Sequence, residues 1–159
     1  MSTSVDRIET NKLILGTVQL GLSYGINNQN GKPSSAESLK ILNSAKTLGI
    51  NFVDTASTYG DSQALVRQFN QSQSPFRVFT KIKLADADPK TAREAVAKIL
   101  TEIPFDQLEC LFFHRLDEFL AIRNKINLIE EFPNIKFGAS IYTNTELELA
   151  ASFPEIEWI

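Results

Sequence analysis

Short apolar runs alternate along the chain with segments that carry apolar residues at helical spacing. The runs begin near residues 13, 51, 77, 108, 135 and 156, a mean spacing of about 29 residues, which is the length of a strand, a helix and their connections. Strict alternation of this kind predicts a parallel sheet with helices outside it. We therefore expect about five βα units followed by a sixth strand.

Polar residues mark several helix ends. Ser34 with Glu37, and Thr143 with Glu146, have the spacing of capping boxes, so helices are predicted to begin at these two places. A further helix is expected over residues 119–131, where isoleucines recur at helical spacing.

Two architectures fit this alternation, an open doubly wound sheet and a (β/α)8 TIM barrel. No G-x-G-x-x-G turn follows the first apolar run, which weighs against a nucleotide-binding Rossmann sheet. Eight units of this size need roughly 230 residues, whereas the chain has 159. The prediction is an α/β fold, an incomplete (β/α)8 barrel that forms a single domain over residues 1–159. A fragment, a naturally short product and half of a split assembly would each account for the truncated length.

Composition narrows the class of protein. Apolar residues make up 43% of the chain and charged residues 22%, with a net charge of −3 and no run of Lys or Arg, so a nucleic-acid partner is not expected. The single cysteine, Cys110, excludes an internal disulfide and lies within an apolar run, where it is expected to be buried and inert. No apolar run reaches the roughly 18 residues of a membrane span, and we expect a cytoplasmic protein with no membrane contact.

Four titratable residues of different types stand where predicted strands end. Asp54, Lys81 and His114 end the second, third and fourth strands, and Tyr59 lies in the loop after Asp54. Singly, each has an ordinary structural explanation: a helix cap, a packed loop residue, an exposed lysine or a core histidine. Because the carboxyl ends of parallel strands meet at one edge, however, we expect all four at one site.

Together these residue types suit the protonation of a carbonyl oxygen. A lysine ammonium beside a phenol favours the phenolate and lowers its pKa, and a carboxylate would hold that ammonium in place. A neutral imidazole can donate a hydrogen bond to the substrate oxygen. With one His and one Cys in the chain, a metal site is not expected. The partner that attacks the carbon would be a hydride donor, best supplied by a nicotinamide cofactor.

The sequence resembles the aldo-keto reductases, which are NAD(P)H-dependent (β/α)8 enzymes. The matching stretches are residues 15–17, 19–21, 52–56, 59–60, 80–81 and 113–114. The resemblance implies an oxidoreductase that reduces a small-molecule carbonyl to an alcohol. It implies that Tyr59 is the general acid, that Lys81 lowers its pKa with the assistance of Asp54, and that His114 orients the carbonyl.

The resemblance also implies a cofactor, NADP or NAD. Gly16 and Thr17 match the first-strand segment that approaches it, and Ser140 matches the serine of a Ser-Asn pair that holds the carboxamide, although Ile141 replaces the asparagine. Tyr24 is placed in the substrate pocket. The family holds the adenosine-phosphate half by loops after strands seven and eight, which this chain lacks, so the chain alone is expected to be weak or inactive.

Three further expectations concern relatives, rivals and assembly. Residues 19–26 and 137–142 look most like a bacterial branch linked to surface or spore-coat polysaccharide gene clusters. The rival hypotheses are a non-catalytic half-barrel interaction or regulatory module, and an unrelated barrel with Asp54 as a base, which the complete set of four residues disfavours.

An open barrel edge predicts a homo-oligomer. The inward residues expected to lie uncovered are among Leu13, Leu15, Phe52, Val78, Leu111 and Phe137.

Overall fold

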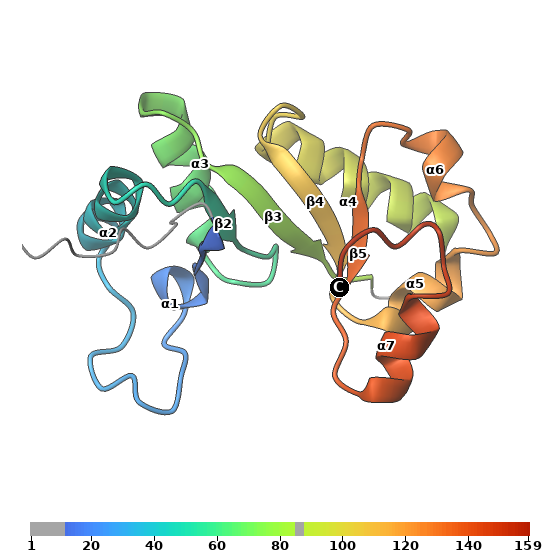
Figure 1. The fold of residues 1–159 in the computed structure, drawn as a ribbon. Helices are drawn as coiled ribbons and strands as arrows, with labels where there is room; N and C mark the ends of the chain where they lie inside the picture. Colours follow the sequence, from blue (N-terminus) through green and yellow to red (C-terminus); the bar gives the residue numbers. More distant parts are fainter. Residues whose placement is uncertain (1–11, 85–87) are drawn as a thin grey trace, which may run out of the picture.

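A computed structural model describes residues 12–84 and 88–159. Its five strands form one sheet in sequence order, and every neighbouring pair is parallel. The strands are β1 (Ile14–Gly16), β2 (Phe52–Asp54), β3 (Arg77–Ile82), β4 (Leu108–Phe113) and β5 (Phe137–Ala139). The predicted parallel sheet of βα units is confirmed, and the sheet is open because β1 and β5 are not paired with each other (Figure 1).

Seven helices are described, and they are distributed along the whole sheet (Figure 1). They are α1 (Val18–Gly21), α2 (Ser35–Thr47), α3 (Ser62–Ser72), α4 (Pro89–Glu102), α5 (Leu116–Ile122), α6 (Leu128–Glu131) and α7 (Asn144–Ala150). Both predicted capping boxes are present, at the starts of α2 and α7. Within the described ranges, none of the helices is both long and apolar enough to cross a membrane.

The single helix expected over residues 119–131 is wrong. The structure has two shorter helices there, α5 and α6, separated by a turn in which Lys125 N donates to Ile122 O at 2.8 Å. The side chain of Asn127 accepts a hydrogen bond from Glu130 N and so caps a new helix instead of continuing the old one. Ile129, expected on the buried face, is 48% exposed as a result.

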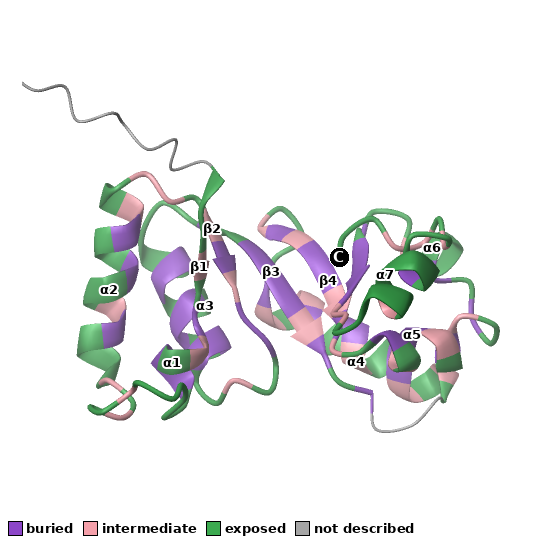
Figure 2. Cartoon of the chain, turned by 60° about the horizontal axis from the view of Figure 1, so that its bottom comes forward, coloured by how far each residue is buried: buried purple, intermediate pink, exposed green. Residues whose placement is uncertain are grey.

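The main core lies between the sheet and its helices. Figure 2 shows buried positions along the strands and on the sides of α2 and α3 that face them. Val78, Leu111 and Phe137 are buried in this core together with helix residues such as Leu42 and Ile99. The expectation that these three strand residues lie uncovered inside the barrel is therefore wrong. Their side chains face the helices, and alternation places their neighbours on the other face.

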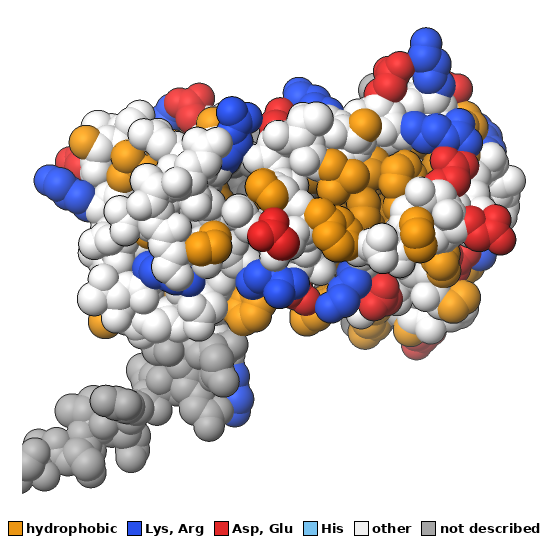
Figure 3. All heavy atoms as spheres, turned by 90° about the horizontal axis from the view of Figure 1, so that it is seen from above, with side chains coloured by type: hydrophobic (Ala, Val, Ile, Leu, Met, Phe, Trp, Pro, Cys, Tyr) orange, Lys and Arg blue, Asp and Glu red, His pale blue; other side chains and the backbone are white. Residues whose placement is uncertain are grey.

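A smaller aromatic group covers that other face, the interior side of the barrel. The Phe79 ring lies 5.9 Å from the Phe52 ring and 6.3 Å from the Phe112 ring, measured between centroids. Cys110 pairs with Phe79 in the ladder and is fully buried, and burial raises the pKa of its thiol, as expected for an inert cysteine. Viewed from above, hydrophobic side chains gather near the middle of the molecule and charged ones lie mainly around the outside (Figure 3).

The sixth apolar run forms one bridge in place of a strand. Gly138 bridges Trp158 in parallel, and Ala139 N donates to Trp158 O at 3.1 Å. The Trp158 ring packs 5.1 Å from that of Phe79, so the end of the chain covers part of the interior face. Among the described residues, no strand pairs with the opposite edge of the sheet at β1, where Leu13 and Ile14 are exposed.

Candidate active site at the carboxyl ends of the strands

Asp54 and Lys81 form an ion pair at the edge where β2 and β3 end. The Nζ of Lys81 donates to a carboxylate oxygen of Asp54 and, at 3.3 Å, to the backbone oxygen of Thr55. The Lys81 side chain is only 12% exposed and that of Asp54 35%, so the two charges are partly shielded from water. The expected pairing of these two residues is confirmed.

Tyr59 and His114 lie beside this ion pair. Lys81 Nζ is 5.4 Å from the centroid of the Tyr59 ring, and the Tyr59 and His114 rings meet edge to face with centroids 6.4 Å apart. The Nε2 of His114 is 3.2 Å from the Thr58 hydroxyl. All four predicted side chains therefore converge at one rim, supplied by the ends of β2, β3 and β4 and by the loop after β2.

Lys81 makes no hydrogen bond to Tyr59 among the described residues, so the expected lowering of the Tyr59 pKa by Lys81 stays a prediction. Burial raises the pKa of the Tyr59 phenol, and the charges of Asp54, Tyr24 and Tyr142 raise it further. Lys81 does not oppose this shift with a hydrogen bond, because within the described residues its ammonium donates to Asp54 and Thr55 and not to the phenol. Tyr59 is thus a protonated phenol at neutral pH.

A chain of buried hydroxyls holds the end of β2. The Thr17 hydroxyl donates to Asp54 O at 2.8 Å, Ser62 Oγ lies 2.6 Å from Thr17 Oγ1, and Thr55 Oγ1 lies 3.2 Å from Ser62 Oγ. All three hydroxyl residues are fully buried. Sequence reasoning missed Thr55 and Ser62, for which the only signal was their position beside a strand end and a helix start. The predicted contact of Thr17 with a cofactor stays a prediction.

Two glycines let the Tyr59 loop lie directly against α1. A Cβ on Gly21 would stand 1.8 Å from Tyr59 O, and one on Gly60 would stand 2.4 Å from Gly21 O. Gly60 also has a φ of +55°, a conformation that side chains disfavour. Tyr59 is therefore presented to the rim by a backbone contact that only glycine permits.

This arrangement is accompanied by a sequence match over most of the chain. The model of the Aldo/keto reductase family matches residues 12–135. The chain belongs to the aldo-keto reductase family. No curated protein matches it significantly.

Solved structures of aldo-keto reductases share the fold. PA4992 of Pseudomonas aeruginosa, a candidate aldo-keto reductase, is 24% identical with a TM-score of 0.63, and the match covers 80% of this chain and 54% of that one. A Klebsiella pneumoniae aldo-keto reductase in complex with NADPH is 17% identical with a TM-score of 0.62, over 89% and 50% of the two chains. The thermostable aldo-keto reductase Tm1743, in complex with the inhibitor epalrestat, is 18% identical with a TM-score of 0.62, over 91% and 54%. The chain thus spans about half the length of these structures.

The remaining predicted residues of this aldo-keto reductase chain lie around the rim. Gly16 is in register with Asp54, and a Cβ placed on it would meet no atom within 4 Å. Ser140 follows β5 and is half-buried, and its hydroxyl has no hydrogen-bond partner among the described residues. Tyr24 is 58% exposed, and Tyr142, which sequence reasoning missed, is 72% exposed. The contacts of Gly16 and Ser140 with a cofactor, and of Tyr24 with a substrate, stay predictions.

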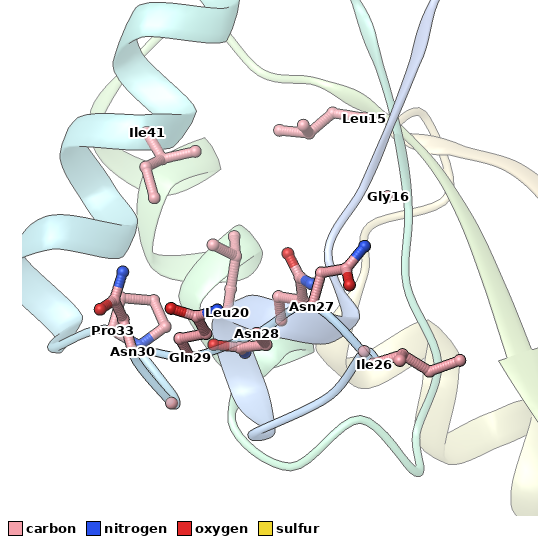
Figure 4. A pocket seen from close by; sticks show the side chains of 13 residues that line it. Leu15, Gly16, Leu20, Ile26, Asn27, Asn28, Gln29, Asn30, Pro33 and Ile41 are labelled. Carbon is pink, nitrogen blue, oxygen red and sulfur yellow. The ribbon is translucent and has the colours of Figure 1, made fainter.

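A pocket of about 550 Å³ lies along β1, outside the group of four. Leu15 on β1 and Ile41 on α2 stand on opposite sides of it, and the loop after α1 supplies amide side chains (Figure 4). Gly16 is the member of the predicted site that lines this pocket. The pocket therefore borders the rim but does not contain the ion pair, Tyr59 or His114.

Proposed function

We propose that this chain carries the catalytic rim of an NAD(P)H-dependent oxidoreductase that reduces a carbonyl to an alcohol. The observation that carries the proposal is the convergence of the Asp54–Lys81 ion pair with Tyr59 and His114 in a member of the aldo-keto reductase family. The Klebsiella pneumoniae structure in complex with NADPH supports a nicotinamide cofactor for this fold. The substrate is a small-molecule carbonyl compound.

The residues that would hold the cofactor are Gly16 and Ser140. Gly16 lets a ring approach the end of β1 without steric hindrance, and the Ser140 hydroxyl is available to a carboxamide. When bound, the reduced nicotinamide supplies a hydride to the carbonyl carbon. The side chain of Ile141 has no polar atom for a second bond to the carboxamide, so this contact is weaker than a two-residue one.

The protein's own groups manage the proton and the carbonyl oxygen. Tyr59, a protonated phenol, donates its proton to the oxygen as negative charge develops there. The Lys81 ammonium beside the Tyr59 ring stabilises the phenolate that remains, and Asp54 keeps that ammonium at the rim. His114 Nε2 donates a hydrogen bond that orients the substrate oxygen, in the position where the Thr58 hydroxyl stands in the structure.

A non-catalytic half-barrel module is the alternative that the rim residues alone do not distinguish. The open sheet and the missing hydrogen bond between Lys81 and Tyr59 are the observations in its favour. An enzyme must bind the nicotinamide cofactor measurably, whereas a module that retained the rim by descent need not.

Titration of NADPH fluorescence with the chain separates the two functions. We expect weak binding that Lys81→Met abolishes, because this change leaves the Asp54 carboxylate uncompensated where an anionic cofactor enters. Lys83→Met removes an exposed lysine two residues away and is the matched control, for which binding should be unchanged. No binding up to millimolar concentration would refute a reductase function for this chain and favour the module or an inactive fragment.

A further inference from the structure

We propose that Glu118 is a positioning residue that sets the orientation of His114 by holding the ends of β3 and β4 together. Glu118 lies in the first turn of α5, and its Oε2 accepts a hydrogen bond from the backbone N–H of His114 at 3.1 Å. Its carboxylate also interacts with the backbone N–H groups of Leu84 and Arg115. The hydrogen bond to His114 fixes the backbone after β4, and the interaction with Leu84 brings the same carboxylate to the backbone after β3.

These two backbone segments carry two members of the candidate site. Lys81 is three residues before Leu84, and His114 directly follows β4. The backbone N–H of His114 also donates to Ile82 O at 2.9 Å, so the ladder and the Glu118 carboxylate share the same donor. A charged acceptor strengthens such a hydrogen bond relative to a neutral one. Glu118 therefore adds a second, charged acceptor to the donor that holds His114 beside the end of β3.

The imidazole itself has little else to hold it. The Nδ1 of His114 is buried and has no hydrogen-bond partner within the described residues. Its other nitrogen contacts Thr58, an exposed residue of a loop. A neutral histidine that donates through Nε2 is ordinarily oriented by a donor group that meets the lone pair of Nδ1. Without one, the direction of the ring depends on its backbone, which the Glu118 carboxylate holds.

Burial is consistent with this role. Glu118 is half-buried, and desolvation raises the pKa of its carboxyl, although the backbone N–H groups of Leu84, Arg115 and His114 act in the opposite direction. Its neighbour Asp117 differs in its exposure and in its main partner. Asp117 is exposed and pairs with the exposed Arg115 at 2.8 Å. Comparing variants of these two adjacent residues therefore distinguishes a positioning role of Glu118 from a general effect of negative charge at the start of α5.

Nuclear magnetic resonance of the 159-residue chain tests the inference, because His114 is its only histidine and gives a single set of ring signals. For Glu118→Ala we expect the ring signals to move or broaden. Amide hydrogen exchange at Leu84 and His114 should become about 10-fold faster or more. Asp117→Ala should leave both measurements as in the unchanged chain. Glu118→Gln keeps one acceptor oxygen and should restore them in part.

The inference rests on the proposed function only in assigning the carbonyl to His114, and neither measurement needs cofactor or turnover. Failure of NADPH to bind would therefore refute the reductase and leave the positioning role standing. Glu118→Ala with ring signals identical to those of Asp117→Ala would overturn the positioning role, even with a lowered melting temperature. If Glu118→Ala does not fold, Glu118→Met, which keeps the bulk of the side chain and removes the acceptor, decides, and unchanged ring signals and exchange rates in that variant would overturn it.

Discussion

Replacing Ser62 with alanine removes the middle hydroxyl of the buried chain that ends on Asp54. Each hydroxyl has one proton to donate. Thr17 donates to the backbone oxygen of Asp54, and Ser62 donates to Thr17, whose hydroxyl and backbone oxygens lie 2.6 and 2.9 Å from Ser62 Oγ. The proton count then leaves Thr55 as the donor to Ser62. Ser62→Ala deletes two of these hydrogen bonds and leaves the Thr55 hydroxyl without its acceptor, in a place that water does not reach. The free energy of unfolding should therefore fall, and β2 should be held less firmly where Asp54 faces Lys81.

The expected loss in the free energy of unfolding follows from the number of hydrogen bonds that Ser62→Ala removes. Two net hydrogen bonds contribute about 1 kcal/mol each, and an orphaned buried donor costs about 1–3 kcal/mol. A loss of about 3 kcal/mol results once the partial relaxation of Thr55 is allowed for. For a domain of this size, that loss corresponds to a fall in melting temperature of roughly 6–12 °C. Thermal and urea unfolding followed by circular dichroism measure it.

Ser35→Ala is the matched control. Ser35 is likewise the first residue of its helix, α2, but it is exposed, so its replacement should change stability by less than about 0.5 kcal/mol. Adding Thr55→Val to Ser62→Ala should be less destabilising than the sum of the two single changes, because valine removes the orphaned donor. A Ser62→Ala variant that melts with Ser35→Ala, or a strictly additive double variant, would refute the hydroxyl chain.

Three other outcomes are expected. In an alkaline titration followed by phenolate absorbance, one phenol should ionise above the ordinary range of tyrosine, and Tyr59→Phe should remove that step, because burial raises the pKa of Tyr59. The free energy of unfolding should fall as the pH rises through this raised folded-state pKa. The chain alone should oxidise NADPH with a generic aldehyde at a negligible rate, since remote cofactor contacts supply binding energy that positions the reacting carbon, and turnover like that of a complete barrel would contradict this. Sedimentation at micromolar concentration should show a dimer or larger species, because the β1 edge is open with Leu13 and Ile14 exposed; a compact monomer with a cooperative melt would exclude it.

The alternation of apolar runs and helical segments predicted the sheet because its period is the length of a whole βα unit. A wrong boundary for one helix or strand does not change that period. It could not tell which strand side chains face the helices. Parallel strands are apolar on both faces, so a run such as that of β4 carries no period of two. From the sequence, Leu111 and Phe112 are both predicted to be core residues. The structure places Leu111 in the main core, against the helices, and the Phe112 ring beside Phe79 on the other face of the sheet.

The ion pair between Asp54 and Lys81 was predictable because strand ends meet at one edge whatever the loops do. The raised pKa of Tyr59 was not, because it follows from the burial of the phenol and from the nearby charge of Asp54, which depend on how the loop after β2 packs. The proposed role of Glu118 could not be predicted from the sequence either. A glutamate in the first turn of a helix is explained by its favourable interaction with the helix dipole alone. Its contacts reach across to Leu84, which no local pattern encodes.

Gly138 controls whether the end of the chain stays on the interior face of the sheet. It lies in β5 between Phe112 and Trp158, and a Cβ there would stand 2.8 Å from the Phe112 ring and 2.9 Å from Trp158 O. The second of these atoms belongs to the backbone and cannot turn aside. Gly138→Ala should therefore displace Trp158, break the hydrogen bond from Ala139 N, and cost about 1–3 kcal/mol.

Trp158 is the only tryptophan in the chain, so its fluorescence reports this displacement directly. In Gly138→Ala we expect emission at longer wavelength and faster quenching by acrylamide, because the ring leaves its contact with Phe79. Gly16→Ala is the control: its Cβ would meet no atom within 4 Å, and its emission should be that of the unchanged chain. Identical emission, quenching and unfolding midpoints in the two variants would show that the last residues do not cover the sheet. The aromatic face around Phe79 would then be free, and the expected oligomer would have a second surface on which to form.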